Sequence, residues 1–349
     1  MFSLKNLFPL PSGTSQAAVD MTHGSGGRAM VRLIDELFIE YFDNELLRQG
    51  NDQASFDIVA GRMVMSTDGY VVSPLFFPGG DIGSLSVHGT VNDIAMSGAM
   101  PLYLSAGFIL EEGFPLSELE RIVAGMAQAA KMAGVEVVTG DTKVVEKGRG
   151  DGVFITTTGV GLVPEGVTIS GDRAKPGDVV LINGSIGDHG VAIMSSREGL
   201  DFETTIKSNS APLHTLVADM VAVAPGIRCL RDPTRGGLAT TLNELVRQSG
   251  VGMRLDEASI PIRPEVAGAC ELLGLDPLYI ANEGKLVCVC SREDAKRLLK
   301  VMGRHPLGRE AVIIGTVTAT NKGFVLMDTR FGGSRMVDWL AGEHLPRIC

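Results

Sequence analysis

The sequence is poor in cysteine and in aromatic residues. Five cysteines in 349 residues are too few, and too odd in number, for a disulfide scaffold, so we expect a reducing, cytoplasmic environment. Aromatic residues make up only 5% of the chain, but apolar residues reach 44%, which is enough to bury the core of a soluble protein. No apolar run approaches the roughly 18 residues of a membrane helix. Asn6 and Pro9 break the first apolar stretch, so a signal peptide is not expected either.

Basic residues are also in deficit. The chain has 31 Lys and Arg against 41 Asp and Glu, a net charge of −10, and it contains no Lys/Arg-rich run. A protein that follows a nucleic-acid backbone needs a basic face, so this class is excluded. An acidic enzyme with a negatively charged substrate would need local cations or a metal ion.

Several well-known site motifs are missing. The sequence has no Gly-x4-Gly-Lys-Ser/Thr loop, no Gly-x-Gly-x-x-Gly turn between a strand and a helix, no His-Glu-x-x-His and no Cys-x-x-Cys pair. Cys288 and Cys290 fall on one face of a predicted strand, and core packing is the favoured interpretation.

Glycine, in contrast, is abundant, with 44 residues spread along the chain at the ends of predicted elements. The length favours two domains, and the turn-rich segment 164–178 marks the boundary. We predict an N-terminal arm (1–20), a first domain (21–165), a second domain (166–327) and a mobile tail (328–349).

Hydrophobic periodicity predicts a mixture of helices and strands in both halves. In the first half, we expect helices over 28–48, 82–97 and 117–134, the last opened by a capping box at Ser117–Glu120, and strands over 62–66, 103–110, 135–138 and 153–163. In the second half, we expect strands over 179–182, 285–290 and 311–317, and helices over 213–224, 238–248 and 291–302, the last with a Ser-x-x-Asp cap. Helices do not separate every pair of strands, so the predicted class is α+β, with mixed or antiparallel sheets packed by helices.

A glycine-rich segment comes immediately before the first predicted helix. It consists of His23, Gly24, Ser25, Gly26 and Gly27. Glycines let a phosphate approach the backbone, and free amides at a helix start suit an anion. A flexible turn that only starts the helix explains the segment equally well.

Three aspartates form a second candidate site. Asp68 and Asp141 follow predicted strands, and Asp93 lies in the second predicted helix. Carboxylates that converge with phosphate oxygens would suit Mg²⁺, and Lys143 would add a cation for a phosphate. Each aspartate taken alone is more often a turn former or a helix cap.

Two further loops carry ionisable groups. Arg231, Asp232 and Arg235 lie in a loop before a helix, where the arginines could bind an anion or make ordinary surface pairs. Glu283 could be a buried base with a raised pKa, although a solvated turn glutamate is the commoner case. His189, in Gly187–Gly190, is interpreted as structural.

The last residue, Cys349, is the oddest feature. A mobile thiol at a chain end can reach into another site, whereas a structural cysteine rarely lies there. An accidental terminal residue is the alternative. Arg347 favours the thiolate and the α-carboxylate opposes it, so local charge does not decide its reactivity.

Taken together, these motifs resemble the HypE family of hydrogenase maturation proteins, within the aminoimidazole ribonucleotide synthetase superfamily. The glycine-rich and aspartate loops are shared by the superfamily, and the terminal Pro-Arg-Ile-Cys is specific to the family. The matching segments are HGSGG (23–27), STDGYVVSPLFFPGGDIG (66–83), VNDIAMSGA (91–99), FILEEG (108–113), VTGDTKVV (138–145), GDHG (187–190), RDPTRGG (231–237), CELLGLD (270–276), ANEGKLV (281–287), HPLG (305–308) and PRIC (346–349).

The resemblance implies a two-domain fold that dimerises through its first domain, with ATP in a cleft near the dimer interface. The carbamoyltransferase HypF would place a carbamoyl group on the terminal cysteine. The chain would dehydrate this thiocarboxamide to a thiocyanate with ATP and pass cyanide to iron on a HypC–HypD complex. The arm before His23 is longer than the family needs, and the segment 331–343 matches no family motif that we can place.

On this basis Cys349, Glu283 and Lys143 are the expected catalytic residues, and Asp68, Asp93 and Asp141 the expected Mg²⁺ ligands. Residues expected to bind ATP are His23, Gly24, Ser25, Gly26, Gly27, Asp68, Asp93, Asp141, Asp232 and Arg235. A cyclo-ligase or thiamine-phosphate kinase with a free substrate, and a non-catalytic carrier, are the alternatives. A selenophosphate synthetase is disfavoured because it needs a reactive cysteine near the N-terminus, and the first cysteine is Cys229.

Overall fold

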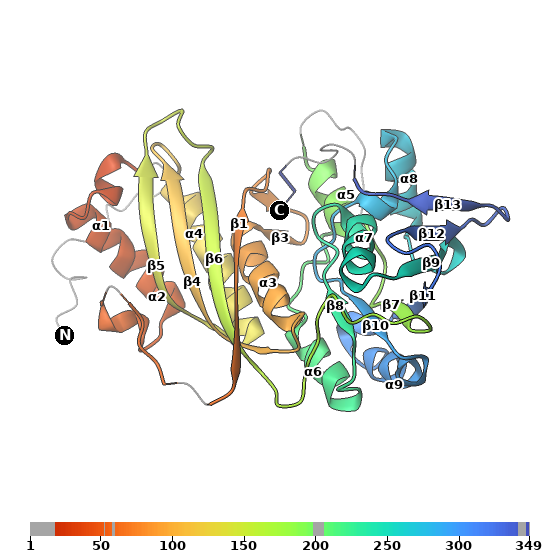
Figure 1. The fold of residues 1–349 in the computed structure, drawn as a ribbon. Helices are drawn as coiled ribbons and strands as arrows, with labels where there is room; N and C mark the ends of the chain where they lie inside the picture. Colours follow the sequence, from red (N-terminus) through yellow and green to blue (C-terminus); the bar gives the residue numbers. More distant parts are fainter. Residues whose placement is uncertain (1–17, 52, 58–59, 198–205, 341–346, 349) are drawn as a thin grey trace.

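Two β-sheets, one in each half of the chain, organise the structure (Figure 1). It is a computed structural model that describes residues 18–51, 53–57, 60–197, 206–340 and 347–348. Among these residues no helix is long and apolar enough to cross a membrane.

The first sheet contains four described strands in the order β1-β6-β4-β5. β6 pairs antiparallel with both β1 and β4, and β4 pairs parallel with β5. Its strands are β1 (Arg62–Tyr70), β4 (Met100–Glu111), β5 (Glu136–Val145) and β6 (Val153–Val163). A small antiparallel pair, β2 (Phe76–Phe77) and β3 (Gly80–Asp81), lies between β1 and the next helix.

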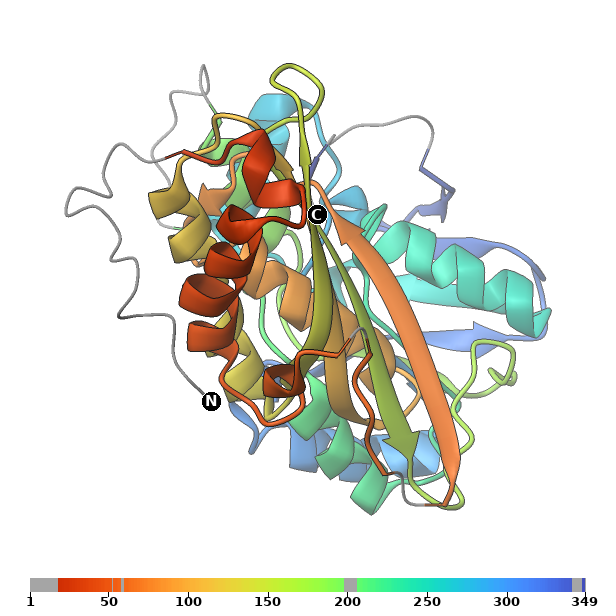
Figure 2. The same cartoon turned by 90° about the vertical axis from the view of Figure 1, so that its left-hand side faces the viewer.

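Helices cover one face of the first sheet (Figures 1 and 2). They are α1 (Arg28–Leu33), the π-helical η4 (Ile34–Phe38), α2 (Ile39–Phe42), α3 (Ile82–Ala95) and α4 (Leu116–Ala133), with short 3₁₀ turns η3 (Met21–Gly24) and η5 (Leu47–Gln49). The Phe38 and Phe108 rings, 5.0 Å apart, join the first helix to β4.

Two predicted helix ends in this half are wrong. The first helix stops at Phe42 rather than residue 48, because Asp43 adopts a left-handed conformation with φ of 38°. Pro115, not a capping box, precedes α4, and no side chain caps its first turn.

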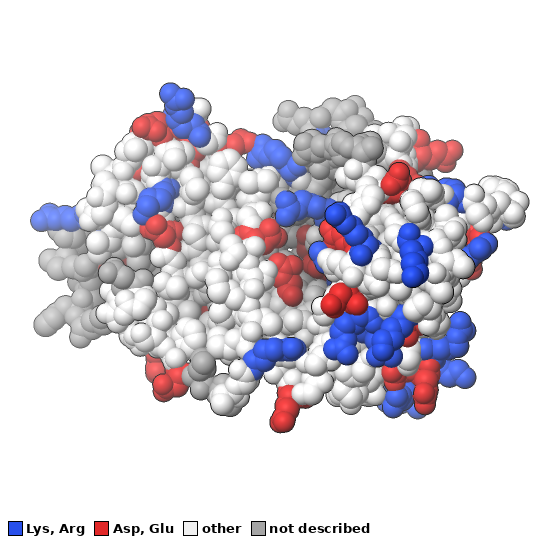
Figure 3. Space-filling view, in the orientation of Figure 1, with Lys and Arg blue, Asp and Glu red and all other residues white. Residues whose placement is uncertain are grey.

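No described helix covers the opposite face of the first sheet, which we call the open face. Its side chains include Met63, Met65 and Ile109, with Met65 70% exposed. Figure 3 shows few charged side chains over this sheet. Exposed apolar side chains on an uncovered sheet are typical of a surface that meets another protein.

The second sheet contains seven described strands in the order β13-β12-β9-β11-β7-β10-β8. β12 pairs parallel with β9, and the other pairs are antiparallel, so the predicted α+β class with mixed sheets is confirmed. Its strands are β7 (Val179–Ile182), β8 (Cys229–Arg231), β9 (Gly252–Asp256), β10 (Val287–Cys290), β11 (Val312–Thr318), β12 (Val325–Asp328) and β13 (Ser334–Val337).

Helices pack on both sides of the second sheet (Figure 1). They are α5 (Asp188–Ser195), α6 (His214–Val223), α7 (Gly237–Ser249), α8 (Pro264–Leu273) and α9 (Arg292–Met302), with 3₁₀ turns η6 (Glu257–Ser259), η7 (Pro277–Tyr279) and η8 (Pro306–Gly308). Ser291 caps α9 by accepting the Asp294 amide at 3.1 Å, as predicted.

The prediction of an unpatterned tail from residue 328 is wrong for Ser334–Val337. These residues form β13, which pairs with β12 at the edge of the second sheet. The segment is only four residues long, and its sequence, Ser-Arg-Met-Val, does not alternate polar and apolar residues, so no strand pattern is visible in it.

The two halves share buried contacts. Ile94 and Met96, at the end of α3, belong to the same apolar cluster as Leu216 and Met220 of α6. Asn92 of α3 accepts the Leu213 amide at 2.7 Å and donates to the Ala211 carbonyl at 3.1 Å. This packing fixes the junction between the halves, where the ionisable residues of the candidate site meet.

Candidate functional site

Asp68 and Asp141 lie within strands rather than in the turns that the sequence predicts. β1 continues through Asp68 to Tyr70, and β5 continues through Asp141 to Val145. Both are edge strands, where polar residues keep one side toward solvent. Asp68-Gly69 and Gly140-Asp141 have the composition of turns, but neither pair ends its strand.

The two aspartates lie at opposite edges of the first sheet. Asp68 pairs with Thr157, Thr157 with Ala106, and Ala106 with Gly140, next to Asp141. Three strand spacings separate them, about 14 Å. One chain therefore does not bring Asp68 and Asp141 to the same ion, and the predicted set of three aspartates does not converge within it.

The β5 edge carries Asp141, Lys143 and the glycine-rich segment. Lys143 Nζ lies 2.6 Å from Asp141 Oδ2, and both side chains are more than half exposed. A Cβ on Gly24 would lie 2.8 Å from the Val144 nitrogen, so only glycine allows this close approach to β5. His23–Gly27 and Lys143 thus occupy neighbouring positions.

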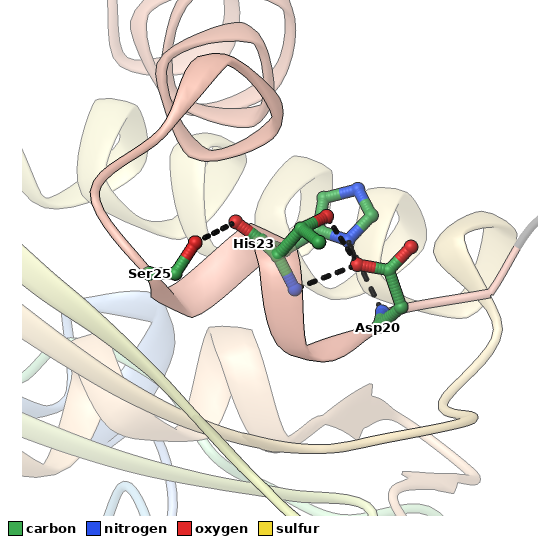
Figure 4. A network of polar contacts seen from close by, with 4 residues as sticks. Asp20, His23 and Ser25 are labelled. Atoms are coloured by element: carbon green, nitrogen blue, oxygen red, sulfur yellow. Dashed lines mark hydrogen bonds and ion pairs between the residues drawn. The ribbon is translucent and has the colours of Figure 1, made fainter.

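The start of the glycine-rich segment is ordered by side chains rather than being a loose turn (Figure 4). Asp20 accepts the Thr22 amide at 2.8 Å, and His23 Nδ1 accepts the Asp20 amide at 3.1 Å. Ser25 Oγ donates to the Thr22 carbonyl at 3.0 Å. Gly26 has a φ of 78°, a conformation that favours glycine.

An apolar cavity of about 110 Å³ lies beside this segment, which sequence reasoning missed. It opens between the first helices and β5, with Asp141 at its polar side. The lining residues are Met30, Ile34, Phe38, Phe42, Leu47, Ala106, Phe108, Val137, Thr139, Gly140, Asp141 and Thr142. The only sequence signal was the apolar stripe of the first helix, which also suits ordinary core packing.

The β1 edge carries a second group of ionisable residues, which we call the acidic cluster: Asp68, Asp93, Asp232 and Glu283. Asp93, on α3, accepts a hydrogen bond from Ser66 Oγ of β1 at 2.7 Å. Arg235, from the loop before α7, reaches Asp68 across the junction at 3.8 Å. Arg231 pairs with Glu244 at 2.7 Å, so the two arginines of this loop have different partners.

Burial, together with neighbouring negative charge, raises the pKa of three carboxyls of the acidic cluster. Burial, and next the Asp68 charge, raise the pKa of Asp93, although the Ser66 hydrogen bond opposes this. Burial and the Asp93 charge raise the pKa of Asp232 to about 7. Burial and the Asp232 charge raise the pKa of Glu283 well above its ordinary value. The cluster is therefore a site with excess negative charge.

Glu283 is a buried carboxyl, not a solvated turn residue. It is 2% exposed, and its Oε2 has no hydrogen-bond partner among the described residues. Gly284 follows with a φ of 68°, and its Cβ position would lie 2.2 Å from the Asn209 carbonyl oxygen. The chain thus turns sharply after Glu283, in a space that only glycine fits.

Asn282, which no sequence pattern singled out, fixes the position of Glu283. The fully buried amide donates to the Pro233 carbonyl at 3.1 Å and to the Ile280 carbonyl at 2.9 Å. Its Oδ1 accepts the Gly187 amide at 2.6 Å. One side chain therefore joins the loop of Asp232, the segment of Glu283 and the start of α5.

The described end of the chain is bound close to α5. Ile348 is 2% exposed, and its carbonyl lies 3.1 Å from His189 Nε2. The Arg347 carbonyl accepts from the Ser73 amide at 3.1 Å and from Arg197 Nη2 at 3.0 Å. The predicted mobility therefore does not apply to Arg347 and Ile348, while Cys349 and 341–346 lie outside the described residues.

The acidic groups are not gathered tightly enough to hold a metal ion alone. No group of three or more His, Cys, Asp or Glu in the described part of the chain could do so. Mg²⁺ commonly takes one or two carboxylates together with phosphate oxygens. The excess negative charge of the cluster fits such a shared ion.

Comparisons with known proteins agree with this architecture. The family described as AIR synthase related protein matches over its N-terminal domain at residues 50–163 and over its C-terminal domain at 175–328. The chain is 67% identical over 340 residues to "Carbamoyl dehydratase HypE" of Cupriavidus necator, covering 97% of each chain. The chain belongs to the HypE family. The resemblance that the motifs indicated is thus confirmed.

Solved structures of this family have the same fold. The structure of hydrogenase maturation protein HypE in complex with ATP matches with a TM-score of 0.91 at 52% identity, over 94% of this chain and 99% of that one. A chain of the HypE–HypF complex matches with a TM-score of 0.78 at 50% identity, over 88% of this chain and 99% of that one.

Proposed function

We propose that this protein is an ATP-dependent carbamoyl dehydratase that acts on its own terminal cysteine. A thiocarboxamide on Cys349 would become a thiocyanate, the source of the cyanide ligand of the iron centre in NiFe hydrogenase. The printed activity of its HypE relatives and the ATP complex of one of them support this. One observation carries the proposal. The chain end is bound by His189 of α5, and the start of the same helix is hydrogen-bonded to Asn282, the residue before Glu283.

ATP would bind along the β5 edge. The cavity has the apolar and aromatic lining that suits the flat faces of a nucleobase, and the glycine-rich segment at the same edge offers backbone amides that suit phosphates. Lys143 would contact a phosphate as a point charge. Its present partner, Asp141, is more than half exposed, so the lysine can exchange that contact for a phosphate at little cost.

A homodimer would complete the site. The Asp141 and Lys143 edge lies about 14 Å from the acidic cluster within one chain, too far for one triphosphate to contact both. Two open faces packed together bury Met63, Met65 and Ile109 and bring the β5 edge of one copy toward the β1 edge of the other. This arrangement supplies the ATP site with residues of both copies, which suits an isologous dimer.

Asp68 and Asp93 would hold Mg²⁺, with Asp232 next to them, and Asp141 would contribute from the other copy. When bound, the ion neutralises charge on the transferring phosphoryl group. Its charge would also offset the repulsion that, after burial, raises the pKa values of Asp93, Asp232 and Glu283.

The chemistry requires an activated oxygen and a base. The thiocarboxamide oxygen attacks the γ-phosphorus of ATP, ADP leaves, and the oxygen becomes part of a phosphate leaving group. Removal of the protons from nitrogen and departure of phosphate then leave the S–C≡N group. Glu283 is buried, and its Oε2 has no hydrogen-bond partner among the described residues, so it is placed to accept a proton, and a raised pKa makes its carboxylate a stronger base.

The chain end makes this reaction intramolecular. A substrate attached to Cys349 reaches the site from a backbone already bound at Arg347 and Ile348, which raises its effective concentration. HypF would load the cysteine, and a HypC–HypD complex would accept the cyanide. The four described cysteines are buried free thiols, which suits a cytoplasmic protein.

Mass spectrometry of the C-terminal peptide tests the proposal. After incubation with HypF, carbamoyl phosphate and ATP, we expect the Cys349 peptide to gain a carbamoyl group and then lose one water. Cys349→Ala should bind ATP without forming either adduct, while Cys270→Ser, a buried cysteine at another place, serves as the matched control. Adducts on Cys349→Ala, or ATP turnover with a free amide in their absence, would favour the free-substrate alternative.

A further inference from the structure

The carbonyl groups of Arg347 and Ile348 are held by three residues far apart in the sequence, which we call the chain-end clamp: Ser73, His189 and Arg197. Ser73 follows β1, and Arg197 follows α5, so the clamp joins the two halves of the chain. Figure 1 places the chain end beside β3 and α5. Ser73 and His189 fall in matching segments (66–83 and 187–190) without a predicted binding role, and Arg197 lies outside every motif.

His189 uses both ring nitrogens, and this fixes its tautomer. A carbonyl oxygen only accepts, so Nε2 carries the proton that it donates to Ile348 at 3.1 Å. Nδ1 then accepts from Ser208 Oγ at 2.8 Å. The imidazole is fully buried, and burial lowers its pKa to about 4, so it stays neutral. Phe77 packs edge-on against the ring at 5.7 Å between centroids.

Arg347 adopts a backbone conformation that needs such support. Its φ is 57°, in the left-handed region that residues with side chains seldom occupy. Its Nε donates to the Val71 carbonyl at 3.1 Å, and its guanidinium pairs with Asp151. The side chain therefore binds the first half of the chain, while its carbonyl is bound by Ser73 and Arg197.

We propose that His189 is a positioning residue for the terminal cysteine. By holding the Ile348 carbonyl, it fixes the point from which Cys349 extends, one residue from the carbonyl that it binds. Ser73 and Arg197 hold the preceding carbonyl, so two successive peptide units are fixed. The catalytic consequence rests on the proposed function, whereas the clamp itself can be tested without it.

Limited trypsin digestion tests the clamp directly, because trypsin cuts after Arg347 and removes a two-residue peptide that mass spectrometry detects. We expect the wild-type bond to be cut far more slowly than in a synthetic peptide of residues 341–349. His189→Leu leaves a buried carbonyl without a donor, so cleavage should be roughly tenfold faster. His189→Gln, which can donate from a similar position, should stay close to wild type.

Two results would overturn the clamp. One is cleavage of the wild-type protein as fast as the peptide, and the other is equal cleavage of the wild-type protein and His189→Leu. If His189→Leu does not fold, Ser208→Ala decides: it removes only the hydroxyl that orients the ring, and cleavage should rise about threefold. No rise in that variant would also count against the clamp.

Single-turnover dehydration of the carbamoylated protein tests the positioning role. We expect His189→Leu to slow formation of the thiocyanate roughly tenfold with the KM for ATP unchanged, and His189→Gln to restore most of the rate. A clamp that opens in the trypsin assay with no change in this rate refutes the positioning role. Absence of thiocyanate in the wild-type protein instead refutes the proposed function and leaves the trypsin result standing.

Discussion

Asp232→Asn changes the charge of the acidic cluster while keeping the size of the side chain. Burial and the Asp93 charge raise the pKa of Asp232 from 3.8 to about 7 in the folded protein. Between about pH 4 and pH 7 the folded chain therefore holds a proton that the unfolded chain has released. The stability of the wild-type protein should fall as the pH rises through this window, and the contribution of this group is lost above pH 7.

A pKa that moves from 3.8 to about 7 corresponds to roughly 4 kcal/mol. Because Asp232 is partly exposed, water screens part of this cost, and we expect about 2 kcal/mol. Urea unfolding at pH 4 and at pH 8 should show Asp232→Asn close to wild type at the lower pH and more stable at the higher one. The variant should lose most ATP turnover, since it also loses a carboxylate of the site.

Addition of Mg²⁺ and ATP provides a second arm of this experiment. If a cation neutralises the cluster, the ligand should stabilise the wild-type protein more than Asp232→Asn, and the gap at pH 8 should narrow. Parallel stability profiles of the two proteins from pH 5 to pH 8 would refute the reasoning, because they would mean that Asp232 has an ordinary pKa. An equal gain from ligand in both proteins would contradict the cation site.

Three further measurements follow from the structure. Asn282→Ala removes the buried amide that joins Pro233 to the start of α5. In urea titrations it should lower the free energy of unfolding by about 2–4 kcal/mol, and a loss under about 1 kcal/mol would contradict its bridging role. Met65→Asp should shift the protein toward monomer in light scattering, since it places a charge on the open face, whereas Met132→Asp, the same change at another exposed methionine on α4, should not. Because burial raises the pKa of Glu283 well above its ordinary value, the dehydration rate should keep increasing with pH above the range in which an ordinary glutamate ionises, and a flat profile there would exclude it as the base.

Elements with strong local signals were predicted well from the sequence. Periodicity correctly predicted the strand at Val153–Val163 and the helices α3 and α9, and capping chemistry correctly predicted the serine cap at Ser291. These segments carry long apolar patterns whose period matches their secondary structure, so local information is enough.

The strand predictions that were wrong depended on neighbouring strands that are distant in the sequence. Asp68-Gly69 and Gly140-Asp141 have the composition of turns, yet hydrogen bonds to β6 and β4 keep them extended. β13 is a short edge strand whose partner, β12, supplies the order that its own sequence does not. A residue-by-residue reading cannot detect a neighbour that is distant in the chain.

For the candidate site, too, the sequence predicted some features and missed others. The chemical type of its residues was evident from the motifs, but the separation of Asp141 from Asp68 depends on strand order, which no motif encodes. Asn282 and His189 act through buried hydrogen bonds, and their sequence surroundings give no indication of those partners. The cavity beside β5 likewise exists only once the first helices pack on the sheet.

The placement of acidic groups at two distant edges has a genetic consequence. If each catalytic centre draws Asp68 from one copy and Asp141 from the other, two inactive variants can complement each other. A mixed pair of Asp68→Asn and Asp141→Asn chains has one centre with both lesions and one with neither. Random pairing of equal amounts would restore about a quarter of the centres, from two proteins that are each inactive when purified separately.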